Sequence, residues 1–356
     1  MSTTLKFPFY AKLFFVLTSL MALFTILYLG QNIIFPIFIS LFIAILLMPI
    51  NDFFEKKCRF SSIFAAFFSV TIFVLLFLVV IWFISWEISD IANDWESIKT
   101  NVFFHIDTLQ ESLKSNFNLS EIEQKTIIDN ASKGSFLNME NMIQNIFSSF
   151  TDILLNLTLI PIYIFLFLIY RTHFNVFLHK LFQRKYHQEL RTILLEIKIS
   201  MQSYIVGLLI EMFLVALLTT IGFMIIGLQY AIVLGIITGI LNMIPYIGIL
   251  IAGGLSVIAT LTGSPDFSLI FWVIIVISIV QFIDNNFFIT FIVGSKVKIN
   301  AFVSIVGIII GGAISGFSGM FLAIPITAIL KVIFDRIKSL EPWGYFMGDE
   351  IPSKKK

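Results

Sequence analysis

The residues of this sequence that could do chemistry are a few polar side chains inside long apolar stretches. Glu211 lies within YIVGLLIEMFLVALL, and Asp284 lies within SIVQFIDNNFF. A charge at the centre of a bilayer costs about 3 kcal/mol or more, so acids inside a membrane generally face a cavity and serve the movement of ions or protons. Glu211 has no basic residue in its own apolar stretch, and a desolvated carboxyl group without a cationic partner favours its protonated form. The sequence therefore indicates Glu211 and Asp284 as candidates for ion coupling.

Asp284 belongs to a polar group with helical spacing. Gln281, Asp284 and Asn285 lie at positions i, i+3 and i+4, which places them on one face of a helix. Lys296 and Lys298 follow within possible reach, so Asp284 is expected to stay ionised. The face could form a wall for a cation or a polar ligand. The alternative is a polar patch that holds helices together or meets water.

Two apolar regions are interrupted near their middle. The first contains LNMIPYIGIL (241–250), and the second contains GIIIGGAISGFSGMFLAIP (307–325). Proline inside a helix costs about 3 kcal/mol or more, and a backbone group freed within a bilayer must be satisfied by protein or by a wet cavity. Broken helices in the two halves of a transporter are the best sequence indication of a substrate site, although simple kinks remain the alternative. The predicted pathway residues in these breaks are Asn242, Pro245, Tyr246, Gly248, Gly311, Gly312, Ser315, Gly316 and Gly319.

Composition excludes several classes of protein. Hydrophobic residues make up 58% of the 356 residues and charged residues 13%, far below the quarter or so of a soluble chain, so this is an integral membrane protein. A net charge of +1 without a basic stripe argues against nucleic-acid binding, and the single cysteine, Cys58, excludes an intrachain disulfide and a cysteine metal site. No Walker motif is present, so this chain is not expected to hydrolyse ATP.

The fragment GFSG (316–319) resembles the surroundings of a rhomboid protease serine. That chemistry needs a histidine base within the membrane, and all four histidines lie in polar segments: His105, His173, His179 and His187. We expect no enzymatic activity, no catalytic residues, no cofactor and no metal site.

The apolar runs predict an all-α polytopic membrane protein. About 20 apolar residues span a bilayer, and six runs have a suitable length: 13–29, 33–50, 61–86, 146–170, 200–226 and 267–289. Regions 229–262 and 299–334 are too long for one span. Their first arms, 231–241 and 299–310, are each about half a membrane long at 1.5 Å per residue, the second ending at Gly311–Gly312. We therefore expect about six full spans plus two re-entrant or broken helical hairpins.

Charge bias predicts the orientation. Loop 51–60, segment 171–198 and the C-terminus are rich in lysine and arginine, which places them and both termini in the cytoplasm. Acidic residues outnumber lysines in segment 87–145, which is therefore expected outside as a small helical domain. The expected organisation is three membrane helices (1–86), the acidic extracytoplasmic domain (87–145), a fourth membrane helix (146–170), a basic cytoplasmic segment (171–199), a transport core with the broken hairpins (200–338) and a cytoplasmic tail (339–356).

Four motifs together resemble the AI-2E (autoinducer-2 exporter) transporter family. They are QSYIVGLL (202–209), GIITGILNMIPYIGILIAG (235–253), IDNNFFITFIVGSKVKINAF (283–302) and GGAISGFSGMFLAIPITAILK (311–331). The sequence departs from the family pattern at Thr290 and Ala301, where proline is common. The resemblance implies transport: some members export the furanone autoinducer-2, and others are assigned sodium(lithium)/proton antiport. It also implies homo-oligomers and a helical region between the third and fourth spans, which matches 87–145.

The sequence thus predicts a secondary transporter in the bacterial cytoplasmic membrane that exports a small polar solute resembling autoinducer-2, with coupling to an ion gradient left open. One alternative is a Na⁺(Li⁺)/H⁺ antiporter that uses Glu211 or Asp284. An alternative of another class is a non-transporting membrane scaffold. The expected partners are the lipid bilayer, a small polar solute or cation, and further copies of this chain.

Overall fold

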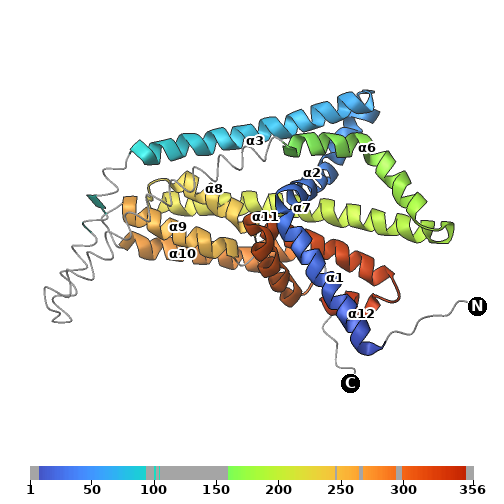
Figure 1. The fold of residues 1–356 in the computed structure, drawn as a ribbon. Coiled ribbons are helices and arrows are strands. Elements are labelled where there is room, and N and C mark those ends of the chain that lie inside the picture. The colour runs from blue at the N-terminus through green and yellow to red at the C-terminus, as the bar shows by residue number, and fades with distance from the viewer. Residues whose placement is uncertain are drawn as a thin grey trace, which may run out of the picture. The chain divides into compact units, whose positions relative to one another are not determined.

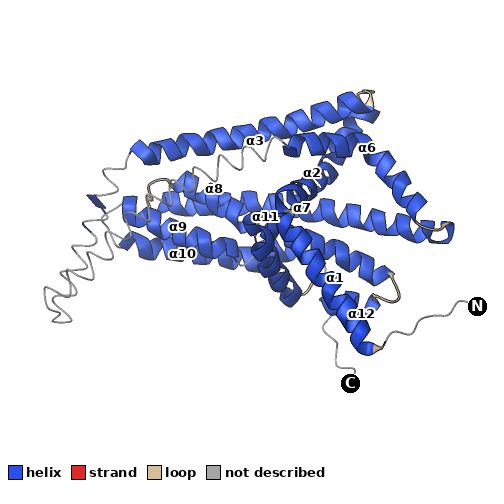
Figure 2. Cartoon of the chain, in the orientation of Figure 1, coloured by secondary structure: helices blue, strands red, loops and turns tan. Residues whose placement is uncertain are grey.

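The computed structural model describes residues 8–93, 100–101, 104, 159–244, 247–263, 268–293 and 299–349. Helices make up almost all of these residues, and no strand occurs among them (Figure 2). Seven helices in this part of the chain are long and apolar enough to cross a membrane. The predicted all-α polytopic membrane fold is therefore confirmed.

The long helices extend several of the predicted spans (Figure 1). They are α1 (Phe9–Leu29), α2 (Gln31–Lys56), α3 (Ser62–Asn93), α6 (Leu159–Leu181), α7 (His187–Ile225), α10 (Ser268–Ile283) and α11 (Ala301–Arg336). The α6 and α7 helices continue far into the basic segment, and a 3₁₀ turn η1 (Arg184–Tyr186) lies between them. Most of segment 87–145 lies outside the described residues, as does the first half of the predicted fourth span.

The chain divides into two compact units. The first unit comprises residues 1–49, 159–201 and 298–356, and the second comprises residues 50–158 and 202–297. Two of the boundaries fall within α2 and α7, so each of these helices contributes to both units.

The first predicted hairpin lies in the second unit. Helix α8 (Ala231–Asn242) packs against α9 (Ile247–Gly263), which in turn packs against α10. The two arms approach very closely, because a Cβ atom at Gly248 would lie 1.8 Å from the Leu241 carbonyl oxygen. Pro245 and Tyr246, two of the predicted pathway residues, lie outside the described residues. The region 229–262 is thus a helical hairpin, as the sequence predicted.

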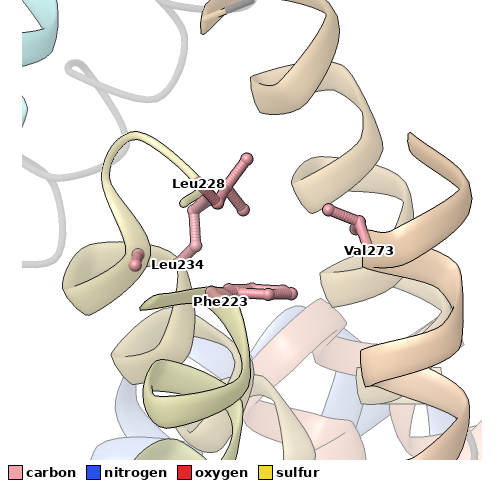
Figure 3. Packing of buried hydrophobic residues seen from close by; sticks show 5 residues of the cluster. Phe223, Leu228, Leu234 and Val273 are labelled. Atoms are coloured by element: carbon pink, nitrogen blue, oxygen red, sulfur yellow. The ribbon is translucent and has the colours of Figure 1, made fainter. Parts of the chain in front are cut away.

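Close contacts also hold α8 against the second half of α7. A Cβ atom at Gly239 would lie 2.5 Å from the Met212 carbonyl oxygen, so only glycine permits this approach. At the end of α7 the Phe223 ring is fully buried with Leu228 and Leu234, and Val273 of α10 packs against the same cluster (Figure 3). These contacts fix the positions of α7, α8 and α10 relative to one another.

The second hairpin lies within α11, in the first unit. Ser315 and Gly316 have non-helical backbone angles, and Gly316 has φ 54° and ψ −134°. A Cβ atom at Gly319 would lie 1.9 Å from the Gly311 carbonyl oxygen, although residues eight apart in a continuous helix are about 12 Å apart. The α11 segment is therefore two arms that fold back on each other.

The predicted position of this second turn was wrong. The sequence placed it at Gly311–Gly312, whereas the chain turns at Ser315–Gly316. The physical reason is that positive φ is needed at the turn itself, and Gly316 supplies it without a Cβ clash. Gly311 instead lets the two arms come into contact.

The C-terminal end of the first unit is tied back to the start of α11. Asn300 caps α11 by accepting a hydrogen bond from the Val303 amide (2.9 Å). Its side-chain amide donates to the carbonyl oxygens of Phe346 (2.6 Å) and Gly348 (3.0 Å), at the end of helix α12 (Glu341–Met347). A single asparagine thus fixes both ends of this segment.

Candidate functional site

Three segments of the second unit bring two acids and an amide together. Glu211 lies in the middle of α7, Asn242 is the last residue of α8, and Asp284 is the first residue of the π-helix η2 (Asp284–Val293) that continues from α10. We call these three residues the carboxyl–amide cluster. Its position is set by the first hairpin, because α8 ends at Asn242 immediately before the break.

The Asn242 amide bridges the two carboxyl groups. Its Nδ2 atom donates to Oε1 of Glu211 at 3.3 Å and to Oδ2 of Asp284 at 3.1 Å. All three side chains are buried, with exposed fractions of 4% for Glu211, 7% for Asn242 and 2% for Asp284. Both donors of the amide are therefore committed to carboxyl oxygens in an interior from which water is largely excluded.

The two carboxyl groups are also neighbours of each other, because one amide nitrogen donates to both. Neither forms an ion pair with any described residue of the chain. Two negative charges this close, without a cation, repel strongly in a surrounding of low dielectric constant. A proton held between the two groups removes that repulsion, so the cluster has the chemistry of a proton-binding pair.

One oxygen of the cluster has no partner. Oδ1 of Asp284 is buried and accepts no hydrogen bond from any described residue. A buried acceptor without a donor is unfavourable, and such atoms in native structures call for an explanation such as an ion or a ligand. A hydroxyl group, a proton or a small cation would satisfy it.

The π-helical start of η2 accompanies this arrangement. A π-helix has wider hydrogen-bonded turns than an α-helix, and π segments occur frequently at functional sites. Asp284 is buried at this point, whereas Asn285 and Asn286 after it are exposed. The backbone thus presents one acid inward and two amides outward.

Two separate contacts hold the predicted face of Gln281, Asp284 and Asn285. Asp284 joins the carboxyl–amide cluster, while Nε2 of Gln281 donates to Oδ1 of Asn285 at 2.9 Å. Oε1 of Gln281 is buried without a partner among the described residues, and a ligand wall formed by all three residues stays a prediction. Lys296 and Lys298 lie outside the described residues.

The remaining predicted pathway residues lie in the two hairpins. Gly248 stands at the start of α9 and faces the end of α8. The α11 hairpin of the first unit contains Gly311, Gly312, Ser315, Gly316 and Gly319. Gly311 and Gly319 hold the arms together and Gly316 forms the turn, so three of these glycines have clear structural roles.

Tyr204 is a residue that the sequence reasoning missed. It lies seven residues before Glu211 on the same face of α7, and its large side chain is almost completely buried. The spacing of seven residues, two helical turns, could have identified it as a neighbour of Glu211. The described residues contain no group of three or more histidine, cysteine or acidic side chains that could hold a metal ion.

Comparison with known proteins places this geometry in context. Residues 17–339 match the model of a family described as AI-2E family transporter. The chain is similar to "Putative transport protein YueF" of Bacillus subtilis, with 32% identity over 229 residues that cover 62% of this chain and 59% of the relative. It is also similar to "Putative transport protein YrrI" of the same organism, with 36% identity over 134 residues, 38% of this chain and 37% of the relative. "Putative permease PerM" of Escherichia coli is 26% identical over 136 residues, 37% of each chain. The matched segments thus span less than two thirds of these relatives.

Proposed function

The chain belongs to the AI-2E family of membrane transporters, and from this premise we propose that it is a secondary transporter in which Glu211 and Asp284 carry the coupling proton. In this proposal the protein resides in the bacterial cytoplasmic membrane with both termini in the cytoplasm, and it exports a small polar solute in exchange for protons. It works in the lipid bilayer as a homo-oligomer.

The observation that carries the proposal is the bridge made by Asn242. Buried carboxyl groups without cationic partners are rare in membrane-spanning segments and generally serve ion or proton movement. Here two buried carboxyl groups, with no cationic partner among the described residues, share one amide at 3.3 and 3.1 Å. A purely structural polar contact needs only one acid or one amide, whereas a proton carrier needs a group that is satisfied in both protonation states.

The cluster meets that requirement. When both acids are ionised, the amide donates to each, but the charges repel. When one proton is bound, it lies between the carboxyl groups and the amide bonds remain. Binding and release of that proton therefore change the charge of the cluster without dismantling it, so the same site can alternate between a more charged and a less charged state.

The unpartnered oxygen of Asp284 supports a place for the transported species. A hydroxyl-rich solute would donate to this oxygen, and a small cation such as Na⁺ would be attracted to it. The second possibility favours the alternative function, Na⁺(Li⁺)/H⁺ antiport, in which the cation and the proton compete for the same pair of acids. A scaffold without transport gives no reason for a buried acid pair beside a helix break.

The test is flux in proteoliposomes with the full-length protein. We expect Glu211→Gln to abolish the dependence of flux on a pH gradient, because the glutamine amide cannot bind and release a proton. Thr238→Val is the matched control: it removes a buried hydroxyl from α8 one turn before Asn242, and that hydroxyl only donates to Leu234 of its own helix. The control should keep the parental pH response.

A second experiment distinguishes solute export from cation antiport. Proton movement is recorded with a pH-sensitive dye while Na⁺, Li⁺ or autoinducer-2 is added on one side of the vesicles. Proton movement driven by Na⁺ and Li⁺ alone identifies an antiporter, and movement driven by the furanone alone identifies an exporter. If Glu211→Gln retains the full pH response in both experiments, Glu211 is structural and the proton-carrier proposal is wrong.

A further inference from the structure

A pocket outside the carboxyl–amide cluster lies at the elbow between α6 and α7, within the first unit. Its cavity has a volume of about 570 Å³. The lining comes from the last turns of α6, from η1 and from the start of α7, and includes Asn175, His179, Lys180, Phe182, Arg184 and His187. No acidic residue lines it. We call this cavity the elbow pocket.

The elbow pocket holds positive charge that the described residues do not neutralise. Lys180 and Arg184 are exposed, and neither forms an ion pair with a described residue. Lys185, by contrast, lies outside the lining with its ammonium group 4.6 Å from the centre of the Tyr186 ring. The two cations of the pocket are thus available to an external anion.

Two histidines line the same side of the pocket. Nδ1 of His179 lies 2.8 Å from the Asn175 carbonyl oxygen, and Nε2 of His187 lies 3.0 Å from the Phe182 carbonyl oxygen. Each carbonyl accepts from its ring nitrogen, so that nitrogen carries a hydrogen, and the other nitrogen of each ring would donate to an anion only in the imidazolium form. The rings lie 5.2 Å apart in an edge-to-face arrangement, so both can approach one ligand.

The surroundings of the pocket are apolar on the side of α6. Phe174, Phe177 and Leu181 are exposed on this helix, which is one of the candidate membrane spans. Val176 and Phe182 continue the apolar surface into the pocket itself. A cavity that is cationic at an elbow and apolar along a spanning helix suits a ligand with an anionic group near a hydrocarbon surface.

We propose that the elbow pocket binds a phosphate group, held by Lys180 and Arg184 and contacted by the histidine pair. Arginine matches the oxygens of phosphate with two parallel N–H donors, and lysine adds a point charge. The phosphate can come from the headgroup of an anionic phospholipid or from a soluble phosphate. Basic pockets between membrane helices are typical sites for anionic headgroups, and the apolar residues along α6 favour that source.

The experiment uses the purified full-length protein in detergent and titrates three probes: short-chain phosphatidylglycerol, short-chain phosphatidylcholine and inorganic phosphate. Binding is followed by native mass spectrometry and by the thermal unfolding midpoint. The pocket variant is Lys180→Ala/Arg184→Ala. The matched control is Lys185→Ala/Arg191→Ala, which removes the same charge from the same elbow outside the lining.

We expect phosphatidylglycerol to bind and to raise the unfolding midpoint, and the pocket variant to weaken its binding roughly tenfold for each cation removed. The control variant should bind like the parent. Saturable binding of inorganic phosphate that depends on the same two residues would also support a phosphate site and would assign it to a soluble ligand.

Three outcomes would overturn the proposal. The first is equal binding of phosphatidylcholine and phosphatidylglycerol, since an anionic ligand would then not be selected. The second is an equal loss of binding in the control, which would indicate general surface charge. The third is binding of phosphatidylglycerol as tight as in the parent, either in the pocket variant or in Arg184→Glu. The unfolding midpoint of Arg184→Glu without ligand also checks that the elbow remains folded.

Discussion

Replacing Asn242 by leucine tests whether its amide sets the proton affinity of the two acids. Leucine has nearly the shape of asparagine but donates no hydrogen bond, so the variant removes the bonds to Glu211 and Asp284 and leaves the packing of α8 in place. The amide donors favour the ionised carboxylates. Without them the protonated forms are favoured, and proton release requires a higher pH.

The magnitude follows from the two distances. Hydrogen bonds to charged groups contribute about 1.5 to 3 kcal/mol each. Bonds of 3.1 and 3.3 Å are longer than the usual 2.9 Å, so about 1.5 kcal/mol is the appropriate end of that range. A bond to the protonated carboxyl group contributes about 1 kcal/mol, so each amide bond favours the ionised form by about 0.5 kcal/mol and the two bonds together by about 1 kcal/mol. Since 1.36 kcal/mol corresponds to one pH unit, the midpoint of the pH dependence should move upward by about 0.7 unit.

The assay is proton-coupled flux in proteoliposomes measured between pH 5.5 and 9. The Thr238→Val control should keep the parental midpoint, because Thr238 donates only within α8. A midpoint that stays in place or moves to lower pH in Asn242→Leu, with flux otherwise intact, would refute the role assigned to the amide.

Three further predictions concern the fold and its topology in the membrane. Gly319→Ala should lower the free energy of unfolding by about 3 kcal/mol, because the new Cβ atom would lie 1.9 Å from the Gly311 carbonyl oxygen. Gly254→Ala is the control: its Cβ atom would meet open space, so the free energy of unfolding should change by less than about 1 kcal/mol. Both are measured by tryptophan fluorescence in detergent. A double-mutant cycle with Arg336→Ala and Glu196→Ala should give a coupling below about 1 kcal/mol, because this ion pair is partly exposed, and a coupling above about 2 kcal/mol would contradict that reasoning. On a Cys58→Ser background, Ser264→Cys should react with a membrane-impermeant thiol reagent from outside and Ser295→Cys only from the cytoplasm; labelling of Ser264→Cys only from the cytoplasm would mean that 229–262 crosses the membrane once.

Much of the fold could be predicted from the sequence because apolar length and helix breakers act locally. The arm predicted at 231–241 differs by one residue from α8, because proline and glycine, which end helices, follow closely in the sequence. The ends of α6 and α7 were harder to predict. Their polar turns, such as HQELRTILLEIK at the start of α7, carry charges typical of a cytoplasmic loop. The same residues are strong helix formers, so the helix includes that segment.

The candidate site could be predicted only in part. Glu211, Asn242 and Asp284 each stood out, because polar atoms in an apolar run must have a partner. That they partner one another depends on how α7, α8 and α10 pack, and the contacts join residues separated by 31 and 42 positions. Helical spacing agrees with the contact between Gln281 and Asn285, but it gave no sign of the π-helix that the chain enters at Asp284.

The two hairpins break the helix by different means, and this difference separates what their variants should do. In the first hairpin, α8 ends at Asn242, and the side-chain amide of this residue bonds to two buried acids. The second turns at Gly316, whose φ of 54° disfavours any other residue, and its arms meet through the backbones of Gly311 and Gly319. Substitutions in the cluster should therefore change the pH response while the protein remains folded, whereas substitutions at Gly311, Gly316 or Gly319 should lower stability before they change coupling. An α11 variant that keeps its unfolding midpoint but loses its pH response would mean that the second hairpin also takes part in proton movement.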